Sequence, residues 1–216
     1  MNRRKFIEYS IKTIALASLP VINFFPKVNL SEDKKKLPWN SSTFKFPLEN
    51  FKLQSGEILK NAFLLVDVNG ALNQSKSNAI IFATCFAGSH KFNQMAYGIN
   101  RALNPLKYCI ITPNLFCSGY SSSPSNTISP QDGPRFPSVT YYDNINAQDK
   151  LISEHFGITN PLMYLGFSMG AQQAFHWGAL HGEKTGGIIP LCGTAKTTTQ
   201  NWICLLYTSD AADEAD

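Results

Sequence analysis

The stretch from Leu162 to Leu180 limits what this chain can fold into more than any other. It reads LMYLGFSMGAQQAFHWGAL: a short apolar run, a Gly-X-Ser-X-Gly pattern centred on Ser168, and a helix expected from Met169. Strand, turn and helix in this order are the context in which such a serine sits on a strained backbone with its hydroxyl above the sheet. Gly166 and Gly170 let the strand and the helix pass where a Cβ would collide. A serine nucleophile is therefore predicted; the alternative is a Gly-rich turn with a buried serine.

Apolar runs bounded by turn signals predict the elements around this turn. A hairpin is expected between Phe51 and Val68, because a Ser-Gly-Glu turn signal separates two apolar segments. Strands alternating with helices predict an α/β fold with a mostly parallel sheet, an antiparallel edge hairpin and flanking helices. The segment from 115 to 139 is longer than an ordinary connection and is expected to be functional. The remaining strands are expected at 78–85, 108–112, 162–165 and 187–191, and the helices at 91–103, at 142–156 and from residue 169.

The first 26 residues are typical of an export signal. The basic pair Arg3-Arg4 precedes an apolar run over residues 13–25, which resembles a twin-arginine signal. Pro20 interrupts this run, which is shorter than the ~20 residues of a transmembrane helix, so no stable membrane anchor is expected. The sequence therefore predicts an exported, periplasmic protein. A cytoplasmic protein with a basic amphipathic N-terminal segment is the alternative.

Basic residues are concentrated ahead of the α/β pattern. The 216 residues, 44% hydrophobic and 16% charged, fit one globular domain, predicted at 45–203 after a solvated linker at 27–44. Eleven of the 19 Lys and Arg residues precede residue 61, alongside five acidic residues, so the net charge of +4 belongs to the N-terminal part. Beyond it stand ten acidic and eight basic residues. A nucleic-acid partner is therefore not expected.

Cysteines, histidines and several carboxylates are expected to have structural roles. Their spacing matches neither a zinc site nor a disulfide framework, so no metal is expected. Because three of the first four cysteines lie in or beside expected strands, buried free thiols are predicted for Cys85, Cys109, Cys117 and Cys192. Helix caps and structural contacts are predicted for His90, His176, His181, Asp132, Asp143 and Asp149.

From about Phe51 to Trp202 the chain resembles the homoserine O-acetyltransferase-like family of α/β-hydrolase-fold proteins. The resemblance is carried by several blocks, the most specific being SMGAQQAFHWG from Ser168 onward. It is similar to the branch that has Ala-Gln-Gln after the serine turn, and it covers the N-terminal part of the family's domain. The other blocks are Ser55-Gly56-Glu57, Gly70-Ala71-Leu72-Asn73, Gly88-Ser89-His90, Ser121 to Asn126, Asp132 to Pro137, Val139-Thr140 and Asp143-Asn144.

The resemblance implies a role for three residues. Ser168 would accept the acyl group, and backbone N–H groups of Met169 and Phe86 would form the oxyanion hole. The acyl group would pass from a small-molecule donor, acetyl-CoA or another ester or thioester, to a hydroxyl acceptor, with no bound cofactor. A homodimer is compatible with the family. The alternative reaction is hydrolysis of a small ester by an exported serine hydrolase.

One part of the family's machinery is missing. In this fold the triad acid and then the histidine follow the serine, yet no histidine follows His181, which belongs to the helix after Ser168 or to its end. The segment 204–216 resembles a translated sequencing adapter. We therefore expect a C-terminally truncated chain that lacks the triad Asp and His, is inactive alone and exposes an open sheet edge. An inert or binding module is the third hypothesis.

Overall fold

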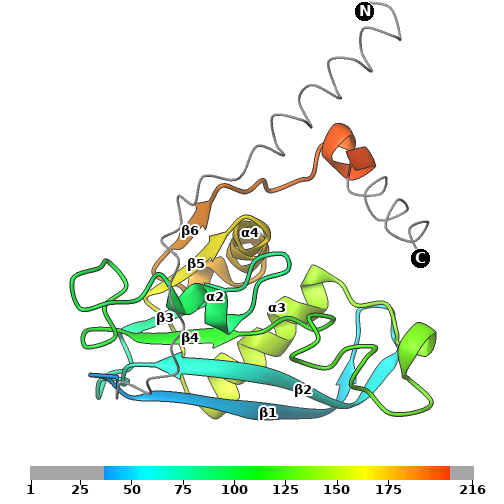
Figure 1. Ribbon diagram of the computed structural model, residues 1–216, viewed down its shortest axis with the longest axis horizontal. Helices are drawn as coiled ribbons and strands as arrows, with labels where there is room; N and C mark the ends of the chain where they lie inside the picture. The colour runs from blue at the N-terminus through cyan, green and yellow to red at the C-terminus, as the bar shows by residue number, and fades with distance from the viewer. Residues whose placement is uncertain (1–36, 205–216) are drawn as a thin grey trace, which may run out of the picture. The chain divides into compact units, whose positions relative to one another are not determined.

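The computed structural model describes residues 37–204 (Figure 1). The predicted signal at 1–26, most of the predicted linker and nearly all of the segment 204–216 lie outside the described residues. Within residues 37–204, no helix is both long and apolar enough to cross a membrane.

A six-stranded sheet forms the centre of the described domain, in the order β1-β2-β4-β3-β5-β6. The edge strand β1 is antiparallel to β2, and β2 is antiparallel to β4. The other neighbours, β4 with β3, β3 with β5 and β5 with β6, are parallel. The predicted mostly parallel sheet with its antiparallel edge hairpin is thereby confirmed. The strands are β1 (Ser41–Lys52), β2 (Ile58–Asn69), β3 (Ala79–Ala83), β4 (Cys109–Pro113), β5 (Met163–Phe167) and β6 (Ile188–Leu191).

The first strand begins within the predicted linker, so the predicted boundary at residue 45 is wrong. Ser41 already pairs with Asn69 of β2. The hydroxyl of Thr43 donates to the buried carboxylate of Asp67 at 2.8 Å. The polar start of β1 resembles a linker in sequence because its partners lie on β2, which follows later in the chain.

Different helices cover the two faces of the sheet. Adjacent residues of β3 point to opposite sides, as successive residues of a strand must. Ile81 joins the larger core cluster with side chains of α3 (Tyr141–Lys150) and α4 (Met169–His181), whereas Ile80 joins a smaller cluster beside α2 (His90–Gln94). The chain therefore leaves β3 toward one face and leaves β4 and β5 toward the other. Short helical turns complete the fold at Gly133–Arg135, Leu151–His155 and Gly182–Lys184.

The helix predicted at 91–103 is wrong in length, because α2 ends at Gln94. The chain turns instead, with the Arg101 N–H donating to the Gly98 carbonyl at 3.1 Å, and Tyr97 bridges to Leu103. Glycine in a helix interior costs about 1 kcal/mol relative to alanine, which disfavours continuing the helix through Gly98. The helix predicted at 142–156 is confirmed as α3 and the π-helical turn that follows it.

The three carboxylates make the structural contacts predicted for them. The carboxylate of Asp143 accepts from the Thr140 N–H at 2.8 Å, and the Thr140 hydroxyl accepts in return from the Asp143 N–H, so the two cap α3. Asp132 is paired with Arg135, whose hydrogen bond lowers the pKa of that carboxyl. Asp149 lies 3.7 Å from the ammonium of Lys184.

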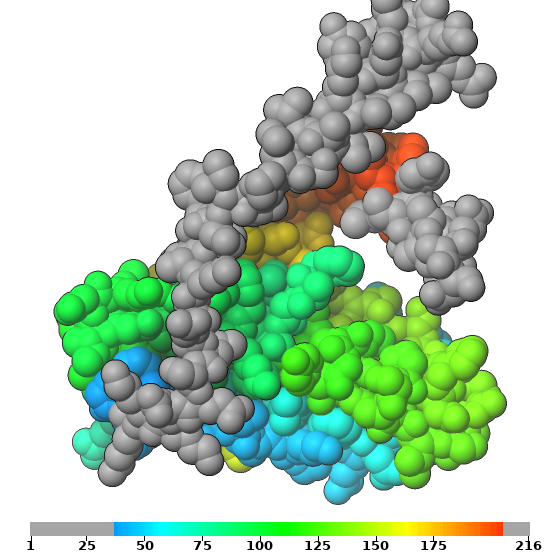
Figure 2. Space-filling view, in the orientation of Figure 1, coloured from blue at the N-terminus to red at the C-terminus, as the bar shows by residue number. Residues whose placement is uncertain are grey.

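The long segment after β4 is bound to the open edge of β2. Since β4 ends opposite Val66, the β2 backbone beyond it needs other partners. The hydroxyl of Ser121 accepts from the Leu65 N–H at 3.0 Å, and that of Ser122 accepts from the Phe63 N–H at 2.9 Å. In the space-filling view this green to yellow-green segment lies against the cyan surface of β2 (Figure 2). Its first residues directly follow the carboxyl end of β4.

Candidate active site

Ser168 occupies the turn between β5 and α4 that the sequence predicts. Its φ of 54° and ψ of −116° lie in a region that costs a non-glycine residue about 1–3 kcal/mol. A Cβ on Gly166 would lie 1.9 Å from the carbonyl oxygen of Gly170, so only glycine fits there. The Ser168 N–H donates to the Leu191 carbonyl at 2.8 Å, which ties the turn to β6. The predicted strand–turn–helix with a strained serine is confirmed.

Four residues with a positive φ lie at the edge of the sheet where Ser168 stands. Ala87, Cys117, Ser168 and Cys192 have φ values of 53°, 65°, 54° and 54°. They follow β3, β4, β5 and β6, whose carboxyl ends lie at one edge because these strands are parallel. Ligands of open α/β sheets bind outside these carboxyl ends, and strained residues gather at functional sites. After each of these four strands the backbone therefore bends sharply at the same edge of the sheet.

The position of these bends corrects the predicted burial of the cysteines. Only Cys109, within β4, is a buried thiol, and burial raises its pKa to about 11. Cys85 is half-buried, and Cys117 and Cys192 are exposed. The apolar runs before them end one to four residues earlier, so these cysteines lie in the loops that rise from the sheet.

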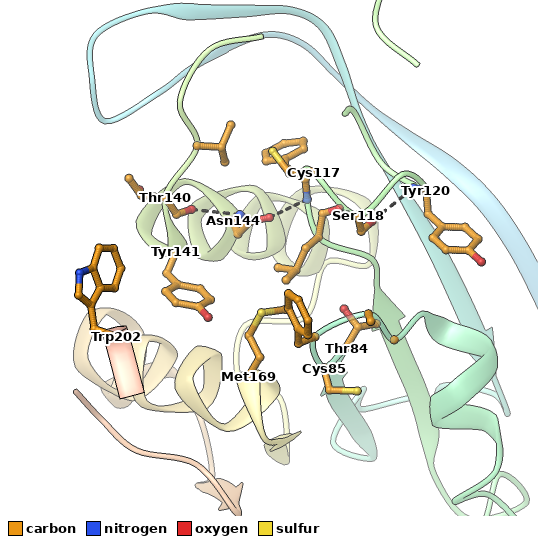
Figure 3. A pocket seen from close by; sticks show the side chains of 16 residues that line it. Thr84, Cys85, Cys117, Ser118, Tyr120, Thr140, Tyr141, Asn144, Met169 and Trp202 are labelled. Carbon is orange, nitrogen blue, oxygen red and sulfur yellow. Dashed lines mark hydrogen bonds between the residues drawn. The ribbon is translucent and has the colours of Figure 1, made fainter. Parts of the chain in front are cut away.

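Two cavities open between these loops. The first, of about 810 Å³, lies between the loops after β3 and β4 and the start of α3 (Figure 3). The second, of about 570 Å³, contains Ser168. Both are lined by apolar and uncharged polar residues. Four residues are shared between the linings: Phe86, Tyr141, Met169 and Trp202.

The second cavity brings together all three residues predicted for the site. Ser168 and Met169 come from the turn between β5 and α4 (the elbow), and Phe86 comes from the loop after β3. Met169 is the first residue of α4, where backbone N–H groups have no partner within the helix. The loop carrying Phe86 closes with a turn in which the Gly88 N–H donates to the Cys85 carbonyl at 3.1 Å. Phe86 is 73% exposed and lines both cavities, so it is accessible to a ligand that enters them.

A buried hydrogen-bond chain, which the sequence analysis missed, holds the loop after β3. Gln173 on α4 donates through Nε2 to the carbonyl of Thr84 at 2.8 Å. Its Oε1 accepts from Nε2 of Gln148 on α3 at 3.1 Å, and Oε1 of Gln148 accepts from the Tyr164 hydroxyl at 2.5 Å. All three side chains are fully buried, and burial raises the pKa of Tyr164, which keeps the phenol a donor. The sequence did offer one signal for this chain of bonds: Gln173 is a polar residue on the small-residue face of the helix that follows Ser168.

This chain of bonds fixes the position of the loop that carries Phe86 relative to the turn at Ser168. Thr84 stands two residues before Phe86, and its carbonyl cannot rotate without breaking the bond from Gln173. On the other side of β3, the Asn93 amide donates to the carbonyls of Phe82 and Ala83 at 3.0 and 3.2 Å. The end of β3 is therefore held from both faces of the sheet.

A family model for the alpha/beta hydrolase fold matches residues 78–207, more than half of the chain. The chain belongs to the alpha/beta hydrolase family. Its sequence is 39% identical over 152 residues to an ethyl acetate hydrolase of Pseudomonas veronii, covering 70% of this chain and 44% of that protein. It is 31% identical over 176 residues to a homoserine O-acetyltransferase of Methanosarcina acetivorans, covering 74% of this chain and 32% of that protein.

A solved structure agrees with this assignment. The crystal structure of an acetylester hydrolase from Corynebacterium glutamicum superposes with a TM-score of 0.72 at 35% identity, covering 75% of this chain and 47% of that one. This chain spans between about a third and a half of the length of the curated relatives it matches.

The histidines of this alpha/beta hydrolase-family chain make structural contacts. Nδ1 of the buried His90 lies 3.1 Å from Nδ2 and 3.3 Å from Oδ1 of Asn114. His176 bonds through Nδ1 to the Gln172 carbonyl at 2.9 Å, and Nδ1 of His181 lies 4.0 Å from the Asp149 carboxylate. Over residues 37–204 neither cavity lining contains a histidine or a carboxylate, and no group of His, Cys, Asp and Glu could hold a metal ion.

Proposed function

We propose that the whole protein is a serine esterase that cleaves small neutral esters through an acyl-enzyme on Ser168. The observation that carries this proposal is the position of Ser168 on a strained turn facing a cavity with an uncharged lining. A neutral ester can enter such a space without leaving a buried charge unpaired, which would be costly.

Three groups of this chain would perform the first step. The Ser168 oxygen attacks the ester carbonyl carbon and gives up its proton to a base. The oxyanion that forms accepts hydrogen bonds from the backbone N–H groups of Met169 and Phe86, and one such donor is worth roughly 10²–10³ in rate. The carbon–oxygen bond to the alcohol then breaks, and the alkoxide takes the proton. Water attacks the acyl-enzyme in the same way, releasing the acid and free Ser168.

Esterase activity now stands ahead of acyl transfer, which the sequence analysis placed first. The ethyl acetate hydrolase is more similar to this chain than the homoserine O-acetyltransferase named with it, at 39% against 31% identity. Homoserine as acceptor carries an ammonium and a carboxylate, and the described linings offer neither of them an oppositely charged side chain. We further propose that the protein is exported, as its first 26 residues predict. Hydrolysis outside the cytoplasm needs only water, whereas acetyl-CoA is a cytoplasmic donor.

A product assay on the whole protein separates the two reactions. With ethyl acetate as substrate we expect release of acetate, without any requirement for acetyl-CoA. Ser168→Ala should lower the rate by roughly 10⁴–10⁶-fold, whereas Ser153→Ala, on the exposed turn after α3, should leave it unchanged. Formation of O-acetylhomoserine from acetyl-CoA and homoserine, with ethyl acetate left intact, would favour the acyltransferase instead.

A further inference from the structure

Thr84 has a buried hydroxyl that faces the first cavity. The residue is 1% exposed, and among residues 37–204 its Oγ1 meets no hydrogen-bond partner. It lines the cavity of about 810 Å³, and Figure 3 shows its oxygen turned toward the other lining side chains. A hydroxyl that leaves water without gaining a partner destabilises the fold, so its presence on a cavity floor needs an explanation.

The surrounding structure prevents this hydroxyl from finding a protein partner. The Thr84 carbonyl accepts from Gln173, and the carbonyl before it, of Ala83, accepts from Asn93, so the backbone is fixed. A β-branched side chain has few rotamers on a fixed backbone. The one side-chain amide in this lining, that of Asn144, is already engaged: its Oδ1 accepts from the Phe116 N–H at 2.8 Å and its Nδ2 donates at 3.0 Å to the Thr140 carbonyl.

We propose that Thr84 Oγ1 donates a hydrogen bond to an oxygen atom of the bound ester and thereby selects substrates that carry an extra oxygen. This proposal rests on the proposed esterase function and names its substrate class. The remaining lining near Thr84 is largely apolar, with Phe86, Leu115, Phe116 and Met169. The favoured group is therefore short and carbon-based, with one ether, hydroxyl or carbonyl oxygen at the depth of Thr84. A site built to bond a substrate oxygen discriminates against the analogue that lacks it.

Isosteric ester pairs test this selection in the whole protein. Methyl methoxyacetate and methyl butyrate differ by one oxygen in the acyl part, and 2-methoxyethyl acetate and butyl acetate differ by one oxygen in the alcohol part. The ratio of kcat/KM within each pair is compared between variants, which cancels the intrinsic reactivity of the esters. We expect Thr84→Val to lower the oxygen preference roughly three- to tenfold in one pair, and Thr84→Ser to retain it.

The pair that responds identifies which part of the ester occupies this cavity. Thr159→Val, on the exposed loop before β5, should change neither ratio. Unchanged ratios for both pairs in an active Thr84→Val enzyme would overturn the role of Thr84 while leaving the esterase intact. Cleavage of none of the four esters by the unmodified protein would refute the esterase proposal and the role of Thr84 with it.

Thermal unfolding gives a second reading that does not depend on activity. Without ligand, Thr84→Val removes an unsatisfied buried group and should raise the midpoint by roughly 2–4 °C. Thr84→Ser should not raise it. A lower midpoint for Thr84→Val would show that the hydroxyl already has a partner, such as an ordered water, and would contradict the proposal.

Discussion

Replacing Gln173 by leucine should destabilise the protein more than any other single exchange of an uncharged polar residue on α4. Leucine fills much of the same space but can neither donate to the Thr84 carbonyl nor accept from Gln148. Both abandoned groups remain buried, since Gln148 is fully buried and Thr84 is 1% exposed. Each costs about 1–3 kcal/mol when left unsatisfied.

The two losses sum to about 2–6 kcal/mol, and apolar burial of leucine offsets part of this, so we expect a net loss of about 2–4 kcal/mol. A loss of that size is a large share of the 5–15 kcal/mol by which domains are typically stable. Urea unfolding of the whole protein, followed by far-UV circular dichroism, measures it as a lower midpoint at unchanged slope.

The neighbouring glutamine provides the matched control. Gln172 is only half-buried, accepts from the Tyr141 hydroxyl at 2.7 Å and donates to the Thr197 hydroxyl at 3.3 Å. Water can replace both bonds, so Gln172→Leu should cost less than about 1 kcal/mol. If the two variants lost equal stability, or if Gln173→Leu lost less than about 0.5 kcal/mol, the buried hydrogen-bond chain would not stabilise the fold as argued.

Three further predictions concern the elbow and its helix. Gly166→Ala should cost about 3 kcal/mol or more in urea unfolding, because its Cβ would overlap the Gly170 carbonyl. Gly182 has open space around its Cβ position and a φ of −57°, so Gly182→Ala should stabilise the protein by about 0.4–1 kcal/mol. Equal effects of the two exchanges would refute the close approach at Gly166. Ser168→Gly should abolish ester hydrolysis yet raise the unfolding free energy by about 1 kcal/mol, because glycine adopts a positive φ freely. A lower unfolding free energy for this variant would argue against backbone strain at Ser168. Burial lowers the pKa of His181 below 6.5, more than the nearby Asp149 raises it. The unfolded state therefore binds the proton first, so the unfolding free energy should fall as the pH drops below 6.5. His181→Gln should flatten that fall, and an unaltered pH profile would contradict it.

Local patterns were sufficient to predict the elbow. Gly166 makes its close contact with the Gly170 carbonyl within the turn itself, so the sequence alone indicates it. The central strands could be predicted for a similar reason, since both faces of β3 and β4 are buried and the sequence there is almost entirely apolar.

Features that depend on distant partners could not be predicted in the same way. The start of β1 is polar and needs β2 to become a strand. Gln173 has its partners on the β3 loop and on α3, so its role becomes visible only when these elements are placed side by side. Cys117 and Cys192 follow apolar strands closely, and the bends that expose them carry no glycine signal because cysteine itself adopts the left-handed conformation there.

The central claim is that Ser168 is the nucleophile of a serine esterase, and covalent labelling tests it most directly. The whole protein is treated with a fluorophosphonate, and the modified peptide is located by mass spectrometry. We expect one adduct, on Ser168, that is absent from Ser168→Ala and appears at the rate at which ester hydrolysis is lost. An intact Ser168 in a protein that still hydrolyses esters would contradict it.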